Sequence, residues 1–269
     1  MRKTIVLIYN HFATILWRHK GDFELKSGVP QGGNLSPLLF NVFINDAPEN
    51  NNIELSLFAD DIAAYSAHEI TNVAIDDMTD YLAIMSEWLN LWFLSLNTKK
   101  CNAILFNPDE PNPPSLNIQI SNTPIPWSPD LTYLGVNLDS RLNWTKQIET
   151  STKKANQKMG ALKSIMNTNG IHLNTKLMLY KTLILPQILY GYPAWKTCSS
   201  KNINKLQVLQ NRCLRTITQA PWYVRNATLH TDLEVKYISL KLNEICTKFF
   251  ERTIESDNPI IKLLNQAML

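Results

Sequence analysis

The stretch LSLFADDIAAY, Leu55–Tyr65, places two adjacent carboxylates, Asp60 and Asp61, inside a run that is otherwise apolar or small. The pattern predicts a β-hairpin, with a strand over Ile53–Ala59, a turn at the aspartates and a strand over Ile62–Ser66. Burying an unpaired carboxylate is costly, so the acids need a compensating partner. Two explanations stay open at this point: hydrogen bonds from turn N–H groups to a good turn former, or a bound divalent cation such as Mg²⁺.

Helical and strand patterns alternate around this hairpin. A helix is predicted over residues 4–19, another over Pro37–Ala47, where Ser36 is a good N-cap and proline suits the first helical position, and a third over Thr71–Trp92. Asn107–Ser115, NPDEPNPPS, has four prolines in nine residues and predicts a linker. Short strands are expected in LSLNTKKCNAILF, LNIQISNTPIPW and LTYLGVNLD. The apolar face of the second helix is expected to hold Leu38, Leu39, Val42 and Phe43.

The pattern after Asp139 is helical. In the helix expected over Trp144–Met166, the apolar residues form one stripe, and at about 100° per residue Lys146 and Lys153 fall nearly opposite it, with Lys154 about 120° away. Such a helix buries one face and presents lysines on the other, which suits a phosphate backbone and also an ordinary surface helix. The stripe consists of Ile148, Ala155, Met159, Leu162 and Met166.

Charge is distributed unevenly along the 269 residues, although the net charge is only +3. Residues 1–139 hold 7 Lys+Arg against 16 Asp+Glu, and residues 140–269 hold 19 against 7. Between Arg141 and Arg225 there are 14 basic residues and a single acid, Glu149. This asymmetry favours a polyanionic partner, while a lysine-rich surface with no such partner remains the alternative.

Composition also excludes several classes of protein. The four cysteines are scattered singly, so they predict free thiols and neither a disulfide framework nor a zinc site. The opening run MRKTIVLIYNHFATILW is too short and too polar to span a bilayer and lacks a signal-peptide cleavage site. We therefore expect a soluble intracellular protein with no membrane segment.

A second motif precedes the hairpin: SGVPQGGNLSPLLFN, Ser27–Asn41. Its glycines let the backbone approach a ligand closely, Gln31 can donate and accept hydrogen bonds, and the loop leads into a helix N-terminus that favours phosphate. In this order and spacing, GVPQGGNLSPLLFNVFIND and LFADD resemble the reverse transcriptases of jockey-like non-LTR retrotransposons. The segments WLNLWFLSLNTKKCNAILF, YLGVNLDSRLNW and LYGYPAWKTCSSKNINKLQVLQNRCLR are similar to that family's next motifs.

The resemblance implies an RNA-directed DNA polymerase that adds nucleotides to a primer 3′-hydroxyl with two Mg²⁺ ions. Its partners would be an RNA template paired with a DNA primer and a deoxynucleoside triphosphate, and its location the cytoplasm and nucleus as a ribonucleoprotein. By the same resemblance, the catalytic and metal-binding residues are Asp60 and Asp61. The nucleotide-binding residues are Pro30, Gln31, Gly32 and Lys100, the primer-binding residues Tyr133, Leu134 and Gly135, and the nucleic-acid backbone contacts Lys146, Lys153 and Lys154.

The fold that the resemblance implies is α+β. It comprises a partial palm over 1–107, a linker and primer-grip-like hairpin over 108–139, a basic helical thumb over 140–225 and a helical extension over 226–269. The family's site uses a third carboxylate upstream of the glycine loop, and Asp22 does not match it. We therefore expect an N-terminally truncated chain with its hairpin at a sheet edge, weak Mg²⁺ binding and little polymerisation. A non-catalytic nucleic-acid-binding remnant is the alternative.

Overall fold

The computed structural model describes residues 4–11, 33–92, 94, 98–107, 117–120, 123–256 and 261, with only the backbone described for Thr4–His11. The chain forms two compact units, one of Met1–Tyr133 with Asp139–Arg141 and one of Leu134–Leu138 with Leu142–Leu269. Each unit has its own hydrophobic core. The predicted linker lies largely outside the described residues, as do Asp22 and the Pro30–Gly32 part of the glycine loop.

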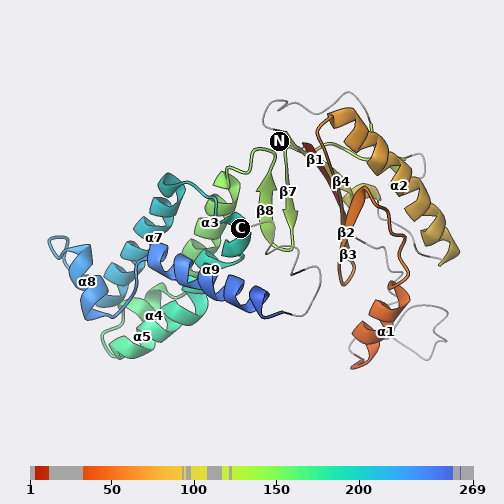
Figure 1. Cartoon of the computed structure of the whole chain (residues 1–269). Helices are drawn as coiled ribbons and strands as arrows, with labels where there is room; N and C mark the ends of the chain where they lie inside the picture. Colours follow the sequence, from red (N-terminus) through yellow and green to blue (C-terminus); the bar gives the residue numbers. More distant parts are fainter. Residues whose placement is uncertain are drawn as a thin grey trace. The chain divides into compact units, whose positions relative to one another are not determined.

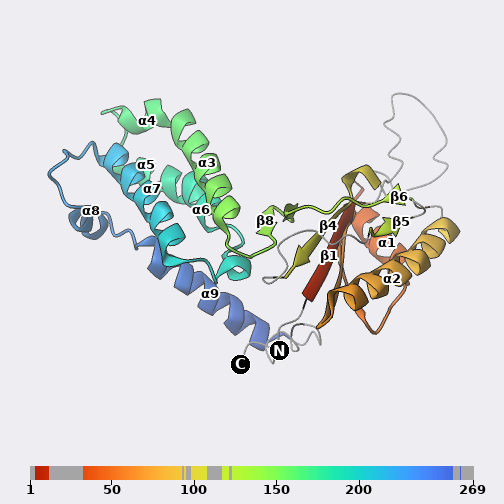
Figure 2. The ribbon, with the colours of Figure 1, turned by 90° about the horizontal axis from the view of Figure 1, so that it is seen from above.

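A four-stranded antiparallel sheet forms the centre of the first unit, in the order β2-β3-β1-β4. Helix α2 packs along one face of this sheet (Figures 1 and 2). The elements of this unit are β1 (Thr4–His11), α1 (Ser36–Phe43), β2 (Ile53–Phe58), β3 (Asp61–His68), α2 (Thr71–Leu91), η1 (Thr98–Lys100), β4 (Asn102–Phe106), β5 (Gln119–Ile120), β6 (Thr123–Pro124) and β7 (Asp130–Tyr133).

The prediction of a helix over residues 4–19 is wrong for Thr4–His11, which forms the strand β1. Its residues, TIVLIYNH, are rich in β-branched side chains, which favour a strand. The deciding contribution is pairing on both sides, because β1 bonds to β3 along one edge and to β4 along the other. The hairpin β2–β3 still borders the sheet, with β2 as the edge strand and β3 covered by β1.

Helix α2 confirms the helix predicted from its apolar spacing. Eight of its residues are buried at intervals of one or three positions, so the helix presents one continuous apolar face to the sheet. Helix α1 differs from expectation, because Leu38, Leu39 and Val42 are exposed among the described residues. The buried anchor at this point is Ile44, just past the helix, with Phe40 and Phe43 packed against the same core.

The second unit is almost entirely helical (Figure 1). Together with the small antiparallel sheets, this confirms the α+β prediction with a mostly helical C-terminal half. The chain enters it through the hairpin β7–β8. The remaining elements are β8 (Val136–Asp139), α3 (Thr145–Ala161), α4 (Lys163–Asn167), α5 (Leu173–Leu179), the π-helical segment η2 (Tyr180–Ile184), α6 (Leu185–Leu189), η3 (Tyr192–Trp195), α7 (Ser200–Thr218), α8 (Asn226–Asp232) and α9 (Ile238–Ile254).

The predicted apolar stripe of residues 144–166 lies in this core. Ile148, Ala155 and Met166 are buried, and Met159 and Leu162 pack against them. The single predicted helix is divided at Leu162 into α3 and α4. The stripe is continuous across the division, so both helices contribute to one core.

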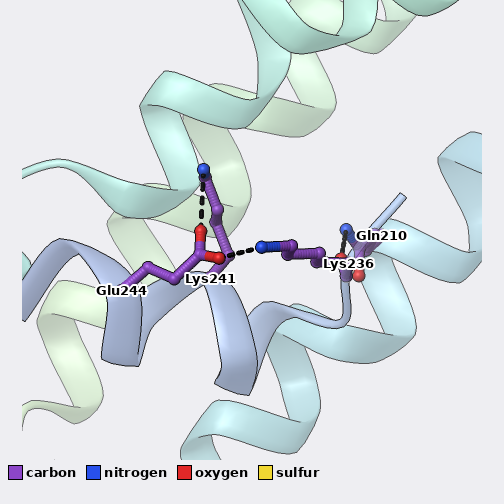
Figure 3. A network of polar contacts seen from close by, with 4 residues as sticks. All are labelled: Gln210, Lys236, Lys241 and Glu244. Atoms are coloured by element: carbon purple, nitrogen blue, oxygen red, sulfur yellow. Dashed lines mark hydrogen bonds and ion pairs between the residues drawn. The ribbon is translucent and has the colours of Figure 1, made fainter. Parts of the chain in front are cut away.

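Polar contacts attach the last helices to α7. The Gln210 side chain donates to the Lys236 carbonyl at 3.1 Å, and Gln207 accepts from the Ile238 N–H at 2.8 Å at the start of α9. Next to this junction, the Glu244 carboxylate pairs with the ammonium groups of Lys236 and Lys241 (Figure 3). Helix α9 is therefore fixed to the same core as α7. All four cysteines are free, and no helix in the described ranges is long and apolar enough to cross a bilayer.

Candidate functional site

The two aspartates lie at the tight turn between β2 and β3, as the sequence predicts. Phe58 and Asp61 are the last paired residues of the hairpin, so the loop between them consists of Ala59 and Asp60. Ala59 has a φ of 51°, in the left-handed region, and two-residue hairpin loops need such positive φ values. Alanine tolerates that region less well than glycine. The turn therefore stores local strain directly beside Asp60.

Asp60 and Asp61 differ in their surroundings. Asp60 is exposed at the tip of the turn, while Asp61 is half-buried at the first position of β3. Asp61 stands opposite Phe58 on β2 and opposite His11 on β1. The two neighbouring carboxylates thus combine a solvent-facing acid with one held by the sheet.

Lys100 lies at the same end of the sheet as the aspartates. Tyr9 of β1 pairs with Asn102 at the start of β4, and His11, two residues on, pairs with Asp61. Lys100 comes two residues before Asn102, in η1, and is exposed. The Asn102 side chain donates to the Lys100 carbonyl at 3.3 Å, which fixes the backbone there. A cation and two acids from separate segments therefore share one sheet end.

Carboxylate oxygens are the ligands that Mg²⁺ prefers, and the ion is commonly held by one or two carboxylates with water and substrate phosphates completing its shell. Asp60 and Asp61 fit that donor set, since one is open to solvent and the two are adjacent. Within the described ranges, no group of three or more His, Cys, Asp or Glu residues is placed to hold a metal. The pair can therefore serve as a partial, substrate-completed site.

Three predicted nucleotide-binding residues, Pro30, Gln31 and Gly32, lie outside the described residues. Gly33 is the first described residue of the glycine loop, and its carbonyl accepts a hydrogen bond from the Ser36 N–H at 3.2 Å. Helix α1 begins at Ser36 with proline in its first turn, as the sequence predicts, but the N-cap is Leu35 and not Ser36, and the helix ends at Phe43 and not at Ala47. The nucleotide-binding role of these three residues stays a prediction.

Tyr133, a predicted primer-binding residue, contacts the strand that leads into the aspartate turn. Its hydroxyl lies 3.1 Å from Oγ of Ser56 on β2. Ser56 pairs with Ala63 of β3, so the contact falls on the same hairpin as Asp60. No sequence pattern links Tyr133 to Ser56, because 77 positions separate them.

Leu134 and Gly135, the other predicted primer-binding residues, form the turn between β7 and β8. Both have positive φ values, 45° and 79°, as a tight two-residue hairpin loop requires. The Tyr190 hydroxyl donates to the Leu134 carbonyl at 2.8 Å, and its ring stands against Gly135. The turn is thereby held in one conformation by the helical unit.

The predicted backbone-contacting lysines all lie on the exposed side of α3. Lys146, Lys153 and Lys154 are exposed, while the opposite side of the helix is buried. Only Lys153 of the three lines a shallow groove of about 700 Å³ between α3 and α7. The groove is lined by Ile148, Glu149, Thr152, Lys153, Asn156, Gln157 and Lys205.

Lys205, for which the sequence predicts no role, supplies a cation to this groove from α7. Asn156 on α3 also accepts a hydrogen bond from the Arg212 guanidinium of α7, at 2.5 Å. The groove therefore combines two lysines with amide and hydroxyl groups that can donate to phosphate oxygens, and it also contains one carboxylate, that of Glu149. Lys205 is one of several basic residues in and just before LQVLQNRCLR, and this clustering is the sequence signal that could have identified it. Only the packing of α7 on α3, however, brings Lys205 close to Lys153.

Comparison with known proteins places most of the chain in a single group. A family model described as reverse transcriptase (RNA-dependent DNA polymerase) matches residues 2–138. A "Probable RNA-directed DNA polymerase from transposon BS" of Drosophila melanogaster is 31% identical over 237 residues, covering 85% of this chain and 26% of the relative.

Two further relatives give the same result. The chain is 29% identical to a "Probable RNA-directed DNA polymerase from transposon X-element" of Drosophila melanogaster, covering 91% of this chain and 28% of that protein. It is 28% identical to the "RNA-directed DNA polymerase from mobile element jockey" of Drosophila funebris, covering 90% and 27%. The chain thus spans about a quarter of the length of these relatives. No solved structure matches it significantly.

Proposed function

Because the chain belongs to the reverse transcriptase family and is related to jockey-like non-LTR elements, we propose that it is a part of an RNA-directed DNA polymerase. In this proposal the first unit is the palm portion and the helical unit contains the thumb. The observation that carries the proposal is the turn that presents Asp60 and Asp61 at the same sheet end as Lys100. It lies within the residues that match the family model.

Asp60 and Asp61 would hold Mg²⁺, which brings a nucleoside triphosphate and a primer 3′-hydroxyl together and offsets the charge that develops during transfer. Lys100 would attract the triphosphate, since an exposed ammonium at that sheet end is a point charge for phosphate oxygens. The turn Tyr133–Gly135 would position the primer end. The groove of α3 and α7, with Lys153 and Lys205, would bind the backbone of the template–primer duplex, with Lys146 and Lys154 beside it.

Primer extension on an RNA template with Mg²⁺ tests the polymerase proposal. As the sequence predicts, we expect only weak extension by this chain, and we expect Asp60→Ala to abolish that extension, since a metal ligand is lost. Asp80→Ala is the matched control, because Asp80 is an exposed acid on α2 of the same unit. Extension by Asp60→Ala at the parental rate would contradict the proposed role of the turn.

A second candidate function, a non-catalytic nucleic-acid-binding remnant, is favoured by the groove on α3 and α7, which needs no contribution from the acids. In that case neither the parental chain nor Asp60→Ala extends a primer, yet both retard an RNA–DNA duplex. Lys153→Ala and Lys205→Ala should each weaken this binding and flatten its dependence on salt by about one unit of slope. If neither substitution changes duplex affinity, the groove is not the duplex-binding site, whether the chain is a polymerase part or a non-catalytic remnant.

A further inference from the structure

The connection between α7 and α8 carries two highly exposed aromatic side chains. Trp222 is 90% exposed and Tyr223 is 69% exposed. Their rings meet edge to face, with centroids 6.0 Å apart and planes at 80°, so the two rings are not stacked on each other. In both views the connection projects outward from the helices of this unit (Figures 1 and 2). Tyrosine and tryptophan are enriched at binding surfaces, because each combines a large apolar ring with a polar group.

The connection is held rigidly by the Arg215 side chain. Its guanidinium donates to the carbonyls of Pro221, at 3.0 Å, and Val224, at 2.5 Å, and to the Asn226 side chain at 2.9 and 3.1 Å. A backbone bond from the Val224 N–H to the Pro221 carbonyl closes the turn. The rings are therefore presented on an ordered loop, which lowers the entropy cost of binding a ligand.

A row of cations on α7 leads toward this loop. Lys201, Lys205 and Arg212 are exposed, and at about 100° per residue they fall within about 40° of each other around the helix. Lys205 lines the groove, and Arg212 bonds to Asn156 of the same groove. The row therefore follows the groove wall toward the C-terminal end of α7, where the aromatic loop begins.

The charge around the loop identifies the kind of ligand. Arg225 is exposed directly after the aromatic pair, and between Glu149 and Asp232 the sequence contains no acid at all. A protein partner would also accept aromatic and arginine side chains, but eighty residues without a carboxylate favour a polyanion. Stacking faces at the end of a cationic track are the features that bind unpaired bases.

We propose that Trp222 and Tyr223 form a stacking platform for single-stranded nucleic acid, with its phosphates bound along Lys201, Lys205 and Arg212. The inference rests on the proposed nucleic-acid function and extends it from the duplex to an unpaired strand. Stacking tolerates any base, so the platform binds without sequence preference. RNA and DNA strands share this chemistry, and the experiment separates them.

Fluorescence anisotropy of the 269-residue chain with labelled single-stranded RNA, single-stranded DNA and RNA–DNA duplex tests the proposal. We expect the double variant Trp222→Ala with Tyr223→Ala to lose at least about tenfold in affinity for one or both single strands and less than about threefold for duplex. Trp222→Phe with Tyr223→Phe should stay within about threefold of the parental chain. The control is Phe249→Ala, which removes an exposed aromatic from α9.

Loss in the RNA arm assigns the platform to a template-like strand, and loss in the DNA arm to a target-like strand; either supports the proposal. Unchanged single-strand binding by the double alanine variant overturns it. An equal loss for duplex and single strands also overturns it, as does a change in oligomeric state by light scattering without a change in nucleic-acid binding.

A second measurement does not depend on affinity. Single-stranded oligonucleotide should quench the tryptophan fluorescence of the parental chain, and Trp222→Phe should remove that part of the quenching. Duplex binding that is weakened in Lys153→Ala reports separately on the proposed function, because Lys153 lines the groove and is not part of the cation row on α7. If the chain binds duplex while the aromatic substitutions change nothing, the stacking-platform proposal is wrong and the proposed function is not affected. If the chain binds no nucleic acid, both proposals are wrong.

Discussion

The Tyr133 hydroxyl lies 3.1 Å from Oγ of Ser56, which joins the strand before the Leu134–Gly135 turn to the hairpin that carries Asp60. The two residues are 77 positions apart in the chain. The contact is exposed, so its energy is modest, but it fixes where β7 meets the edge strand β2.

Removing the Tyr133 hydroxyl or the Ser56 hydroxyl should lower the free energy of unfolding by about the same amount. We expect Tyr133→Phe and Ser56→Ala each to lower the free energy of unfolding by about 0.5–1.5 kcal/mol, the usual net value of one hydrogen bond. The double variant should lose little more than either single variant, because both remove the same interaction. Urea denaturation of all four proteins measures this cycle, and fully additive losses would show that the hydroxyls act independently.

The strained turn at Ala59 predicts that one substitution, to glycine, does not destabilise the fold. Ala59 has a φ of 51°, so Ala59→Gly should leave the free energy of unfolding unchanged or raise it by up to about 1 kcal/mol. Ala59→Val should lower it by at least about 1 kcal/mol, since β-branched residues tolerate this region poorly. Thermal unfolding of the three proteins tests the order Gly, Ala, Val, and a valine variant as stable as the parental chain would refute the strain.

Gly191 should be intolerant of a side chain. Its φ is 66°, and an added Cβ would lie 2.7 Å from Cγ2 of Val136. We expect Gly191→Ala to lower the free energy of unfolding by about 1–3 kcal/mol through strain and crowding. Gly160→Ala is the control, since its Cβ would meet nothing within 4 Å, and a helical position should gain about 0.5–1 kcal/mol. Equal effects of the two substitutions would contradict this account.

Glu244 should titrate below the ordinary glutamate range. Hydrogen bonds from Lys236 and Lys241 lower the pKa of its carboxyl from the usual 4.5 (Figure 3). Because the folded-state pKa is the lower one, the associated stability is present above the unfolded value and is lost as pH falls through the folded value. NMR titration of the Glu244 side chain should show the shift, and Lys236→Met should move the pKa back toward 4.5. A pKa unaffected by that substitution would exclude the ion pair with Lys236 as a cause of the shift.

Several features followed from sequence alone because they depend on local order. The aspartate turn, the strands on either side of it, α2 and the buried stripe of α3 and α4 were predicted from period and turn chemistry. The exposed lysines of α3 followed from the same helical geometry. The family resemblance came from the glycine loop and LFADD, and comparison with known proteins confirms it.

Other features needed the folded chain. Thr4–His11 was expected to be helical, yet pairing with both β3 and β4 makes it a central strand. Leu38, Leu39 and Val42 share a helical face, but periodicity does not show whether a partner covers that face. Lys205 reaches Lys153 only because α7 packs on α3.

The sequence by itself determined the chemistry of this protein, that is, which residues are acidic, basic or aromatic. It also determined the local elements, because turns and helices follow from patterns within a few residues. Tertiary structure alone decided which of those groups meet. Strand pairing put Lys100 at the sheet end of Asp61, and helix packing formed the groove and left Trp222 exposed. The physical reason is that propensity and periodicity act over a few residues, whereas long-range pairing and burial are set by the free energy of the whole fold.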